Sequence, residues 1–233
     1  MKGSTITCQQ CPARQKSVFK NLDDEALNSI NESKSCRHYH KGELIFSEGS
    51  QPRGLFCMQS GDAKVVQSGG DGREQILHLA NTGHIMGYRA LLSDDVFSCS
   101  AIAHEESDIC LIPKAVFTRL TETNSQLNLQ LIHLLSAELK NVERKLTNAV
   151  QKPVLNRLAQ AILGLIGHYG LEADGCTIQT SVKREELANL AGTTRETATR
   201  LLYELKAKKI VELIGKKIRI VNLPELRIIA QQS

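Results

Sequence analysis

The spacing of hydrophobic positions changes along the chain, and each spacing predicts a different kind of structure. From about residue 39 to residue 111, short runs of β-branched and aliphatic residues alternate with polar turn clusters. Glycines recur through this stretch every 11 or 12 residues, at Gly49, Gly61, Gly72 and Gly83. Short strands with turns at that spacing are typical of a small antiparallel barrel or sandwich. A short helix is expected before it, over residues 20–34.

A helical period begins at residue 124 and continues to residue 150. Its apolar positions lie three or four residues apart, at Leu131, Leu135, Leu139, Val142, Leu146 and Ala149. Such a seam either docks on the strand-rich segment or pairs with the same helix of a second chain. Its length and its polar flanks favour pairing, which predicts a homodimer. The predicted dimer contacts are Leu135, Leu139, Val142 and Leu146.

Pro153 is expected to end this helix, because proline lacks a backbone donor and restricts the residue before it. We therefore predict three parts. They are residues 1–123, a connecting helix over 124–152, and a third domain over 153–233.

The pattern of the third part predicts three helices followed by a hairpin. The last of these helices has one apolar stripe, formed by Ala198, Leu201, Leu202 and Leu205. Ala188 in the helix before it permits a close crossing, and Gly192 permits a tight turn between the two. Residues 210–222 alternate as a hairpin, with Gly215 and Lys216 at its turn. Together these elements predict a helix-turn-helix followed by a β-hairpin wing.

Charge is distributed unevenly along the chain. The net charge is +4, but residues 150–233 carry 13 lysines and arginines against 8 acidic residues. Residues 1–149 carry 16 against 17. The basic excess therefore coincides with the predicted helix-turn-helix and suggests a polyanionic partner.

The free side of the last helix carries four polar residues, Arg195, Glu196, Thr199 and Arg200. Arginine can donate two hydrogen bonds to guanine, and glutamate can accept one from cytosine N4. The alternative is that these residues form surface ion pairs, which contribute little to stability. The apolar stripe, the wing and the local positive charge together favour double-stranded DNA as the partner. Phosphate contacts are expected from Lys183, Arg184, Lys216 and Lys217.

With these elements in this order, nearly the whole chain resembles the cyclic-AMP receptor protein/fumarate-nitrate regulator (CRP/FNR) family of bacterial transcription factors. The segment "GTTRETATRLL" is similar to the family's recognition element, and "GKKIRIVNLPELRIIA" is similar to the oxygen-sensing branch. The resemblance implies an α+β fold with an N-terminal antiparallel β-roll of the cyclic-nucleotide-binding type, a long dimerisation helix and a C-terminal winged helix-turn-helix. It implies that Arg195, Glu196 and Arg200 read bases, with Thr199 at a variable reading position. Palindromic DNA and RNA polymerase are the implied partners.

The resemblance is weaker in the expected effector pocket. The family's phosphate-binding cassette contains Gly-Glu and, later, Arg-Ser or Arg-Thr. The segment "GYRALLSDDVFSCSA" keeps Gly87 and Ser100, but Tyr88 replaces the glutamate and Cys99 replaces the arginine. A phosphate without its guanidinium loses charge-assisted hydrogen bonds of about 1.5–3 kcal/mol each. Arg89 is the nearby candidate to replace it; we expect cyclic AMP not to bind, and the effector stays unidentified.

The cysteines suggest a second type of sensor. With no visible secretory signal, the seven cysteines are expected in a reducing cytoplasm, mostly as free thiols or metal ligands. The oxygen-sensing branch holds a [4Fe–4S] cluster on three N-terminal cysteines and one distant cysteine. The resemblance matches Cys8 and Cys11 to the first two and Cys110 to the distant one, while Ser17 stands at the third position and Cys36 is a candidate replacement. The alternatives are a zinc site from Cys8, Cys11 and "CRHYH", a redox dithiol, or idle thiols.

The leading interpretation is a cytoplasmic, homodimeric transcription regulator that binds specific DNA and responds to a signal through its β-roll. The alternative is a small-molecule- or redox-sensing β-roll protein with weak or lost DNA binding. An enzyme is not expected, since neither a G-x-S-x-G nor an H-E-x-x-H motif is present. No apolar run approaches the roughly 20 residues of a membrane-spanning helix, so no membrane partner is expected.

Overall fold

The computed structural model describes residues 6–69 and 74–231. The chain divides into two compact units, an N-terminal unit of residues 1–73 and 77–138 and a C-terminal unit of residues 74–76 and 139–233. Gly72, which was expected at a hairpin turn, lies outside the described residues.

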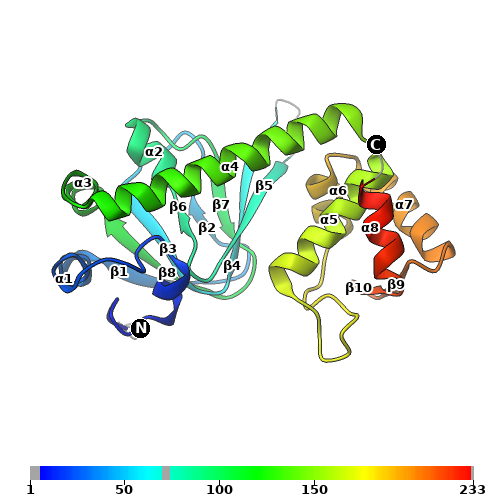
Figure 1. Cartoon of the computed structure of the whole chain (residues 1–233), viewed down its shortest axis with the longest axis horizontal. Helices are drawn as coiled ribbons and strands as arrows, with labels where there is room; N and C mark the ends of the chain where they lie inside the picture. Colours follow the sequence, from blue (N-terminus) through cyan, green and yellow to red (C-terminus); the bar gives the residue numbers. More distant parts are fainter. Residues whose placement is uncertain (1–5, 70–73, 232–233) are drawn as a thin grey trace. The chain divides into compact units, whose positions relative to one another are not determined.

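Two four-stranded sheets form the β part of the N-terminal unit (Figure 1). The first sheet has the order β1 (Ser35–Tyr39), β8 (Ser107–Pro113), β3 (Gly54–Ser60) and β6 (Ile85–Met86). The second has the order β2 (Leu44–Phe46), β7 (Ser100–Ala103), β4 (Asp62–Ser68) and β5 (Glu74–Asn81). The paired strands are antiparallel, which confirms the architecture predicted from the hydrophobic runs and their turns.

Aromatic side chains occupy the core between the two sheets. The ring of Phe46 stacks on Phe97 with centroids 4.1 Å apart and on Phe56 with centroids 5.3 Å apart. Successive strand residues point to opposite faces, so the strands also carry a second apolar row. Leu55 and Ile112 belong to that outer row and are buried in a separate cluster.

Helices cover the outer face of the first sheet. They are the short 3-10 helix η1 (Pro12–Lys16), α1 (Asp24–Ser33), α3 (Lys114–Thr123) and the first turns of α4 (Ser125–Gln151). The α1 helix agrees with the expected helix at residues 20–34 and is capped by Asp23, whose carboxylate accepts a hydrogen bond from the Ala26 N–H at 2.9 Å. Phe117 of α3 and Leu127 of α4 are buried in the shared cluster. The α3 helix and the short α2 helix (Tyr88–Ser93) were not predicted.

Helix α4 contains the predicted dimer seam. Asn124 separates it from α3 and caps it, since its Oδ1 accepts a hydrogen bond from the Leu127 N–H at 2.9 Å. Leu131, the first position of the apolar stripe, is only 3% exposed and packs in the core of its own unit, whereas the predicted dimer contacts begin at Leu135. Each step of four residues rotates the stripe by about 40°, which carries the later positions away from that core. Leu139 is 60% exposed, Val142 57% and Leu146 67%.

Beyond α4, the described part of the C-terminal unit contains four helices and a hairpin. Its elements are α5 (Val154–Tyr169), α6 (Arg184–Ala191), α7 (Arg195–Ala207), β9 (Val211–Ile214), β10 (Lys217–Ile220) and α8 (Leu223–Gln231). Both α6 and α8 pack on α5, and α7 packs on α6 (Figure 1). These elements confirm the predicted helix-turn-helix and its wing.

Helix α8 was not predicted, although its first turn carries a local signal. Asn222 Oδ1 accepts a hydrogen bond from the Glu225 N–H at 3.0 Å, and Pro224 lies in the first turn. In the described part of the chain, no helix combines the length and the apolar surface that a membrane crossing requires.

Candidate nucleic-acid interface and sensor pockets

Helix α7 is held in the C-terminal unit by one apolar stripe. Its members are all buried, as their spacing predicted: Ala198, Leu201, Leu202 and Leu205. Thr194 caps the helix, because its hydroxyl accepts a hydrogen bond from the Thr197 N–H at 3.2 Å. Gly192 ends α6 with a φ of +62°, a left-handed conformation that favours glycine and permits the tight turn. The stripe and the turn together decide which side of α7 faces solvent.

The solvent-facing side of α7 carries exposed charged residues. Arg195, Glu196 and Arg200 are exposed, and among the described residues none of them forms an ion pair. The surface ion pairs considered as an alternative are therefore not formed on this face. Thr199 is half-buried, and its hydroxyl donates a hydrogen bond to the Arg195 carbonyl oxygen at 2.7 Å. The three charged side chains remain available to an external partner.

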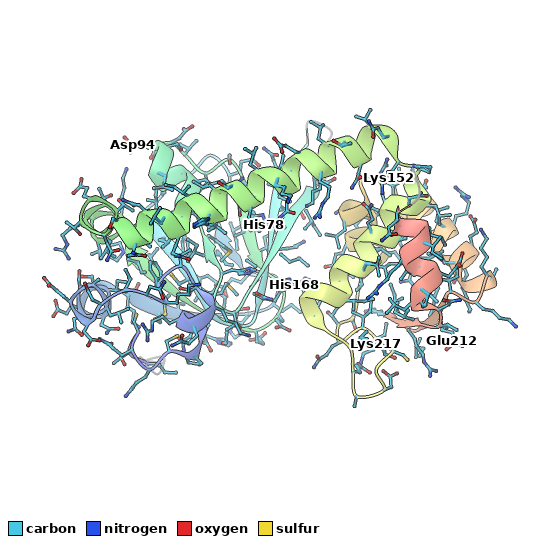
Figure 2. All side chains as sticks on the ribbon, in the orientation of Figure 1. His78, Asp94, Lys152, His168, Glu212 and Lys217 are labelled. Atoms are coloured by element: carbon cyan, nitrogen blue, oxygen red, sulfur yellow. A yellow bond between two sulfur atoms is a disulfide. The ribbon has the colours of Figure 1, made fainter. Side chains whose placement is uncertain are left out.

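The predicted phosphate-contacting residues differ in their exposure to solvent and in their ion pairing. Lys216 is exposed at the tip of the wing, and Lys183 is exposed just before α6. Arg184 is half-buried in the first turn of α6. Lys217, labelled in Figure 2, forms an ion pair with Glu172. A phosphate contact by Lys217 would have to replace that ion pair. Lys216 and Lys183 form no ion pair among the described residues, so a phosphate contact there would break none.

A small pocket lies beside α2 in the N-terminal unit. Four residues predicted for the effector pocket line it: Gly87, Tyr88, Arg89 and Cys99. Ser100 is not in the lining, and its hydroxyl oxygen accepts a hydrogen bond from the Glu48 N–H at 2.9 Å. His78 of β5, labelled in Figure 2, also lines the pocket and was not singled out, because its strand carries no local signal for a ligand.

The polar groups of this pocket differ from those of the family's phosphate-binding cassette. Arg89 Nη2 lies 3.9 Å from Cys99 Sγ, so the guanidinium faces a thiol. The Tyr88 hydroxyl is buried without a hydrogen-bond partner among the described residues. Burial raises the pKa of Tyr88, and the nearby carboxylate of Glu138 raises it further without completing a hydrogen bond. The pocket thus presents a thiol and a neutral phenol where the family's cassette has an arginine and a glutamate.

A second pocket brings four cysteines together. Cys8 and Cys11 precede η1, Cys57 lies on β3 and Cys110 on β8. Cys57 and Cys110 are direct partners across the two strands. Ser17, at the position where the family has its third N-terminal cysteine, lines the same pocket. Cys57 was missed because only the register of β3 on β8 places it beside Cys110.

Two cationic side chains also line this pocket, which we call the sulfur pocket. Lys34 Nζ donates a hydrogen bond to Cys8 Sγ at 3.3 Å. Arg14 Nε is buried without a hydrogen-bond partner among the described residues. Burial raises the pKa of the Cys57 thiol, and electrostatic coupling to the nearby Cys8 and Cys11 thiols raises it further. The pocket therefore suits an anionic group, or a metal that displaces the proton of Cys57.

Cys110 is joined to Cys36 by a disulfide. The two residues are register partners on β1 and β8, and directly opposed side chains have Cβ atoms about 4.5–5.5 Å apart, close to the reach of a disulfide. The expectation of mostly free thiols is wrong for this pair. It holds for the other cysteines, Cys8, Cys11, Cys57, Cys99 and Cys176.

The donors of the sulfur pocket fit a [4Fe–4S] cluster if the disulfide is reduced. Such a cluster is commonly held by four cysteine thiolates and is tuned by the charge around it. Cys8, Cys11, Cys57 and Cys110 line the pocket, and Cys36 does not. Cys57 rather than Cys36 is therefore the better fourth ligand.

The alternative zinc site, from Cys8, Cys11 and the segment "CRHYH", is not assembled among the described residues. In the described residues, the one group of three donors that converges closely enough for a metal ion is His38, His40 and Glu106. That group contains both histidines but no cysteine.

Comparison with known proteins places both units in recognised families. Residues 36–124 match the cyclic nucleotide-binding domain, and residues 156–229 match the Crp-like helix-turn-helix domain. The chain is 28% identical to the fumarate and nitrate reduction regulatory protein of Vibrio cholerae, over 99% of this chain and 93% of that protein. It is 27% identical to the electron transport regulator A of Shewanella oneidensis, over 98% of this chain and 92% of that protein.

Solved structures of similar fold agree with these matches. FixK2 from Bradyrhizobium japonicum superposes with a TM-score of 0.75 at 20% identity, covering 86% of this chain and 98% of that one. A CRP/FNR-family transcriptional regulator from Thermus thermophilus gives a TM-score of 0.73 at 21% identity, covering 85% of this chain and 99% of that one. With a cyclic-nucleotide-binding-type sensory domain and a Crp-like helix-turn-helix in one chain, the protein belongs to the non-enzymatic CRP/FNR family of DNA-binding transcription regulators.

Proposed function

We propose that the protein acts in the cytoplasm as a homodimer that binds an inverted-repeat DNA site and works with RNA polymerase. The observation that supports this mode of DNA binding is the solvent-exposed side of α7. Arg195, Glu196 and Arg200 are exposed there without ion-pair partners among the described residues. Arginine beside glutamate suits a half-site rich in G·C pairs, so a TGTGA-type half-site, with two such pairs, is expected over a TTGAT-type one, with a single pair.

The exposed seam of α4 supports the dimer. Leu139, Val142 and Leu146 present an exposed apolar row that belongs to neither core cluster of the described N-terminal residues. A row of this spacing is typical of a helix that pairs with a second copy. A two-fold dimer then presents two α7 helices to two half-sites of a palindrome.

Fluorescence anisotropy on the two types of palindrome tests the assigned roles. Loss of a base-contacting side chain in Arg200→Ala is expected to cost about 1–3 kcal/mol and to reduce the preference between the two sites. Loss of a phosphate contact in Lys216→Ala is expected to weaken both sites equally and to reduce the slope of log K against log salt by about one. Arg227→Ala is the matched control, because this exposed arginine lies on α8. Equal effects of Arg200→Ala and Arg227→Ala would contradict the assignment.

For the signal, we infer that the sulfur pocket is the responsive element and that cyclic AMP is not the effector. Cys110 has two alternative partners in this arrangement. It is bonded to Cys36 when oxidised, and with Cys8, Cys11 and Cys57 it offers four thiolates when reduced. Reduction of the disulfide by a cellular dithiol takes two electrons and two protons and frees Cys110. An iron–sulfur cluster bound there would react with oxygen, and this reaction would be the signal that the regulator detects.

Protein purified without oxygen tests this inference. Iron content and visible absorption are expected to be lost in Cys57→Ser and retained in Cys176→Ser, a half-buried cysteine of the C-terminal unit. Colourless, iron-free protein would leave the disulfide as the switch, and DNA affinity would then change on reduction of Cys36–Cys110. If neither iron nor reduction changes DNA affinity, the sulfur pocket is not the sensor. The regulator would then respond to a small molecule through the other pocket, or would have lost its response.

A further inference from the structure

Three polar side chains meet on the outer face of the β1–β8 pair, outside the linings of both pockets. His38 lies on β1 opposite Asp108 of β8, while His40 and Glu106 lie just beyond the ends of these strands. Tyr39, between the two histidines, is buried in the core between the sheets. Neighbouring strand residues point to opposite faces, so both histidines project away from that core.

The donor atoms of these side chains converge. His38 Nε2 and His40 Nδ1 both approach Glu106 Oε2, at 2.9 and 3.0 Å. The three ligand atoms lie within 4.8 Å of one another. In a tetrahedral zinc site, bonds of about 2.0–2.1 Å separate the ligand atoms by roughly 3.3 Å. Small side-chain rotations would therefore allow the three groups to share one ion.

Further hydrogen bonds orient these ligands. The second ring nitrogen of His38, Nδ1, lies 2.9 Å from Asp108 Oδ1, and Asp108 Oδ2 accepts a hydrogen bond from Ser60 Oγ at 2.9 Å. Metal-binding histidines almost always donate their second ring N–H to such a carboxylate or to a carbonyl. The Lys41 backbone N–H donates to Glu106 Oε1 at 3.1 Å, so Oε2 is turned toward the imidazoles. The arrangement includes the outer hydrogen bonds of a metal site as well as its ligands.

We propose that His38, His40 and Glu106 bind a zinc ion, with Asp108 as the positioning residue. Two imidazole nitrogens with one carboxylate suit zinc and similar transition metals, whereas calcium and magnesium prefer oxygen ligands alone. The remaining coordination position is open to water, because all three ligands are exposed. The ion joins the segment after β1 to the segment before β8. It would hold this edge of the sheet together even when the neighbouring Cys36–Cys110 disulfide is reduced.

Calorimetric zinc titration of the full chain carrying Cys8→Ser and Cys11→Ser tests the site. These substitutions remove thiols that compete for zinc. One zinc per chain is expected, bound about tenfold or more weakly after His40→Ala or Glu106→Gln, because each removes a ligand. Asp108→Asn is expected to weaken binding by about 10–100-fold, the usual cost of losing an outer partner. His133→Ala, an exposed histidine of α4, is the control and leaves the affinity unchanged.

Absence of zinc binding in this background would overturn the proposal. Affinity that survives both His40→Ala and Glu106→Gln would overturn it as well. NMR of the protein with His38, His40 and His133 in place tests the site even if a substituted variant does not fold. Zinc must shift the NMR signals of the His38 and His40 ring protons and leave those of His133 in place. Shifts at neither His38 nor His40 would also overturn the proposal.

Discussion

Replacing Leu139 by alanine is expected to weaken self-association strongly. Its side chain is 60% exposed on α4. Full burial of a leucine side chain contributes about 1.5–3 kcal/mol, so covering the exposed part contributes about 1–2 kcal/mol. A two-fold interface contains the residue twice, which gives about 2–4 kcal/mol per dimer. Each 1.4 kcal/mol is about tenfold in Kd, so the dimer is expected to dissociate at concentrations about 30- to 1,000-fold higher.

Analytical ultracentrifugation over a concentration series measures this shift. Alanine is a better helix former than leucine, so α4 itself is expected to stay folded, which circular dichroism checks. Leu44→Ala is the matched control, because Leu44 on β2 is 51% exposed and loses the same atoms. The control is expected to dimerise like the wild type.

Two results would refute this reasoning. A wild-type chain that sediments as a monomer at micromolar concentration would mean that the exposed seam pairs with nothing. A Leu139→Ala chain that dimerises as tightly as the wild type would place the interface elsewhere.

Three further predictions concern the two units separately. Calorimetry is expected to detect no micromolar binding of cyclic AMP, because Tyr88 and Cys99 supply no charge to the phosphate or ribose; tight binding that discriminates against AMP would contradict this. Gly87→Ala is expected to destabilise the N-terminal unit by about 1–2 kcal/mol or more in urea unfolding, since φ is +82° and the added Cβ would lie 2.9 Å from the Phe97 ring; unchanged stability would contradict it. Hydrogen bonds from the Thr177 hydroxyl and from backbone N–H groups lower the pKa of Asp174 from 3.8 to about 2. This stabilisation is complete above about pH 4 and lost as the pH falls toward 2, so Asp174→Asn should flatten the profile of urea midpoint against pH in that window, and parallel profiles would contradict it.

Elements governed by local spacing could be predicted from the sequence. The stripe from Ala198 to Leu205 identified both the buried and the exposed side of α7, because the helical period alone decides which residues share a face. Gly215 likewise marked the turn of the wing, where φ is +61°. The exposed polar residues of α7 follow from this local geometry.

Features that depend on pairing between distant strands could not be predicted. Cys36, Cys57 and Cys110 lie in one row only because of the register of β1, β8 and β3. The convergence of Glu106 on His38 depends on the same register. The burial of Leu131 in its own unit could not be predicted for a related reason. Spacing defines a helix face, but it does not say whether that face meets its own domain or a second chain.

The most direct test of the account is the selection of binding sites from random double-stranded DNA by the wild type and by Arg200→Ala. Selection is carried out with both the reduced and the oxidised protein. The wild type is expected to select an inverted repeat whose guanine-containing half-sites lie about one helical turn, roughly 34–36 Å, apart. Arg200→Ala is expected to bind that site about 1–3 kcal/mol more weakly and to lose the preference at one base pair of each half-site. If the wild type selects no palindrome in either state, or if Arg200→Ala selects the same site with equal strength, α7 does not read DNA in the way proposed.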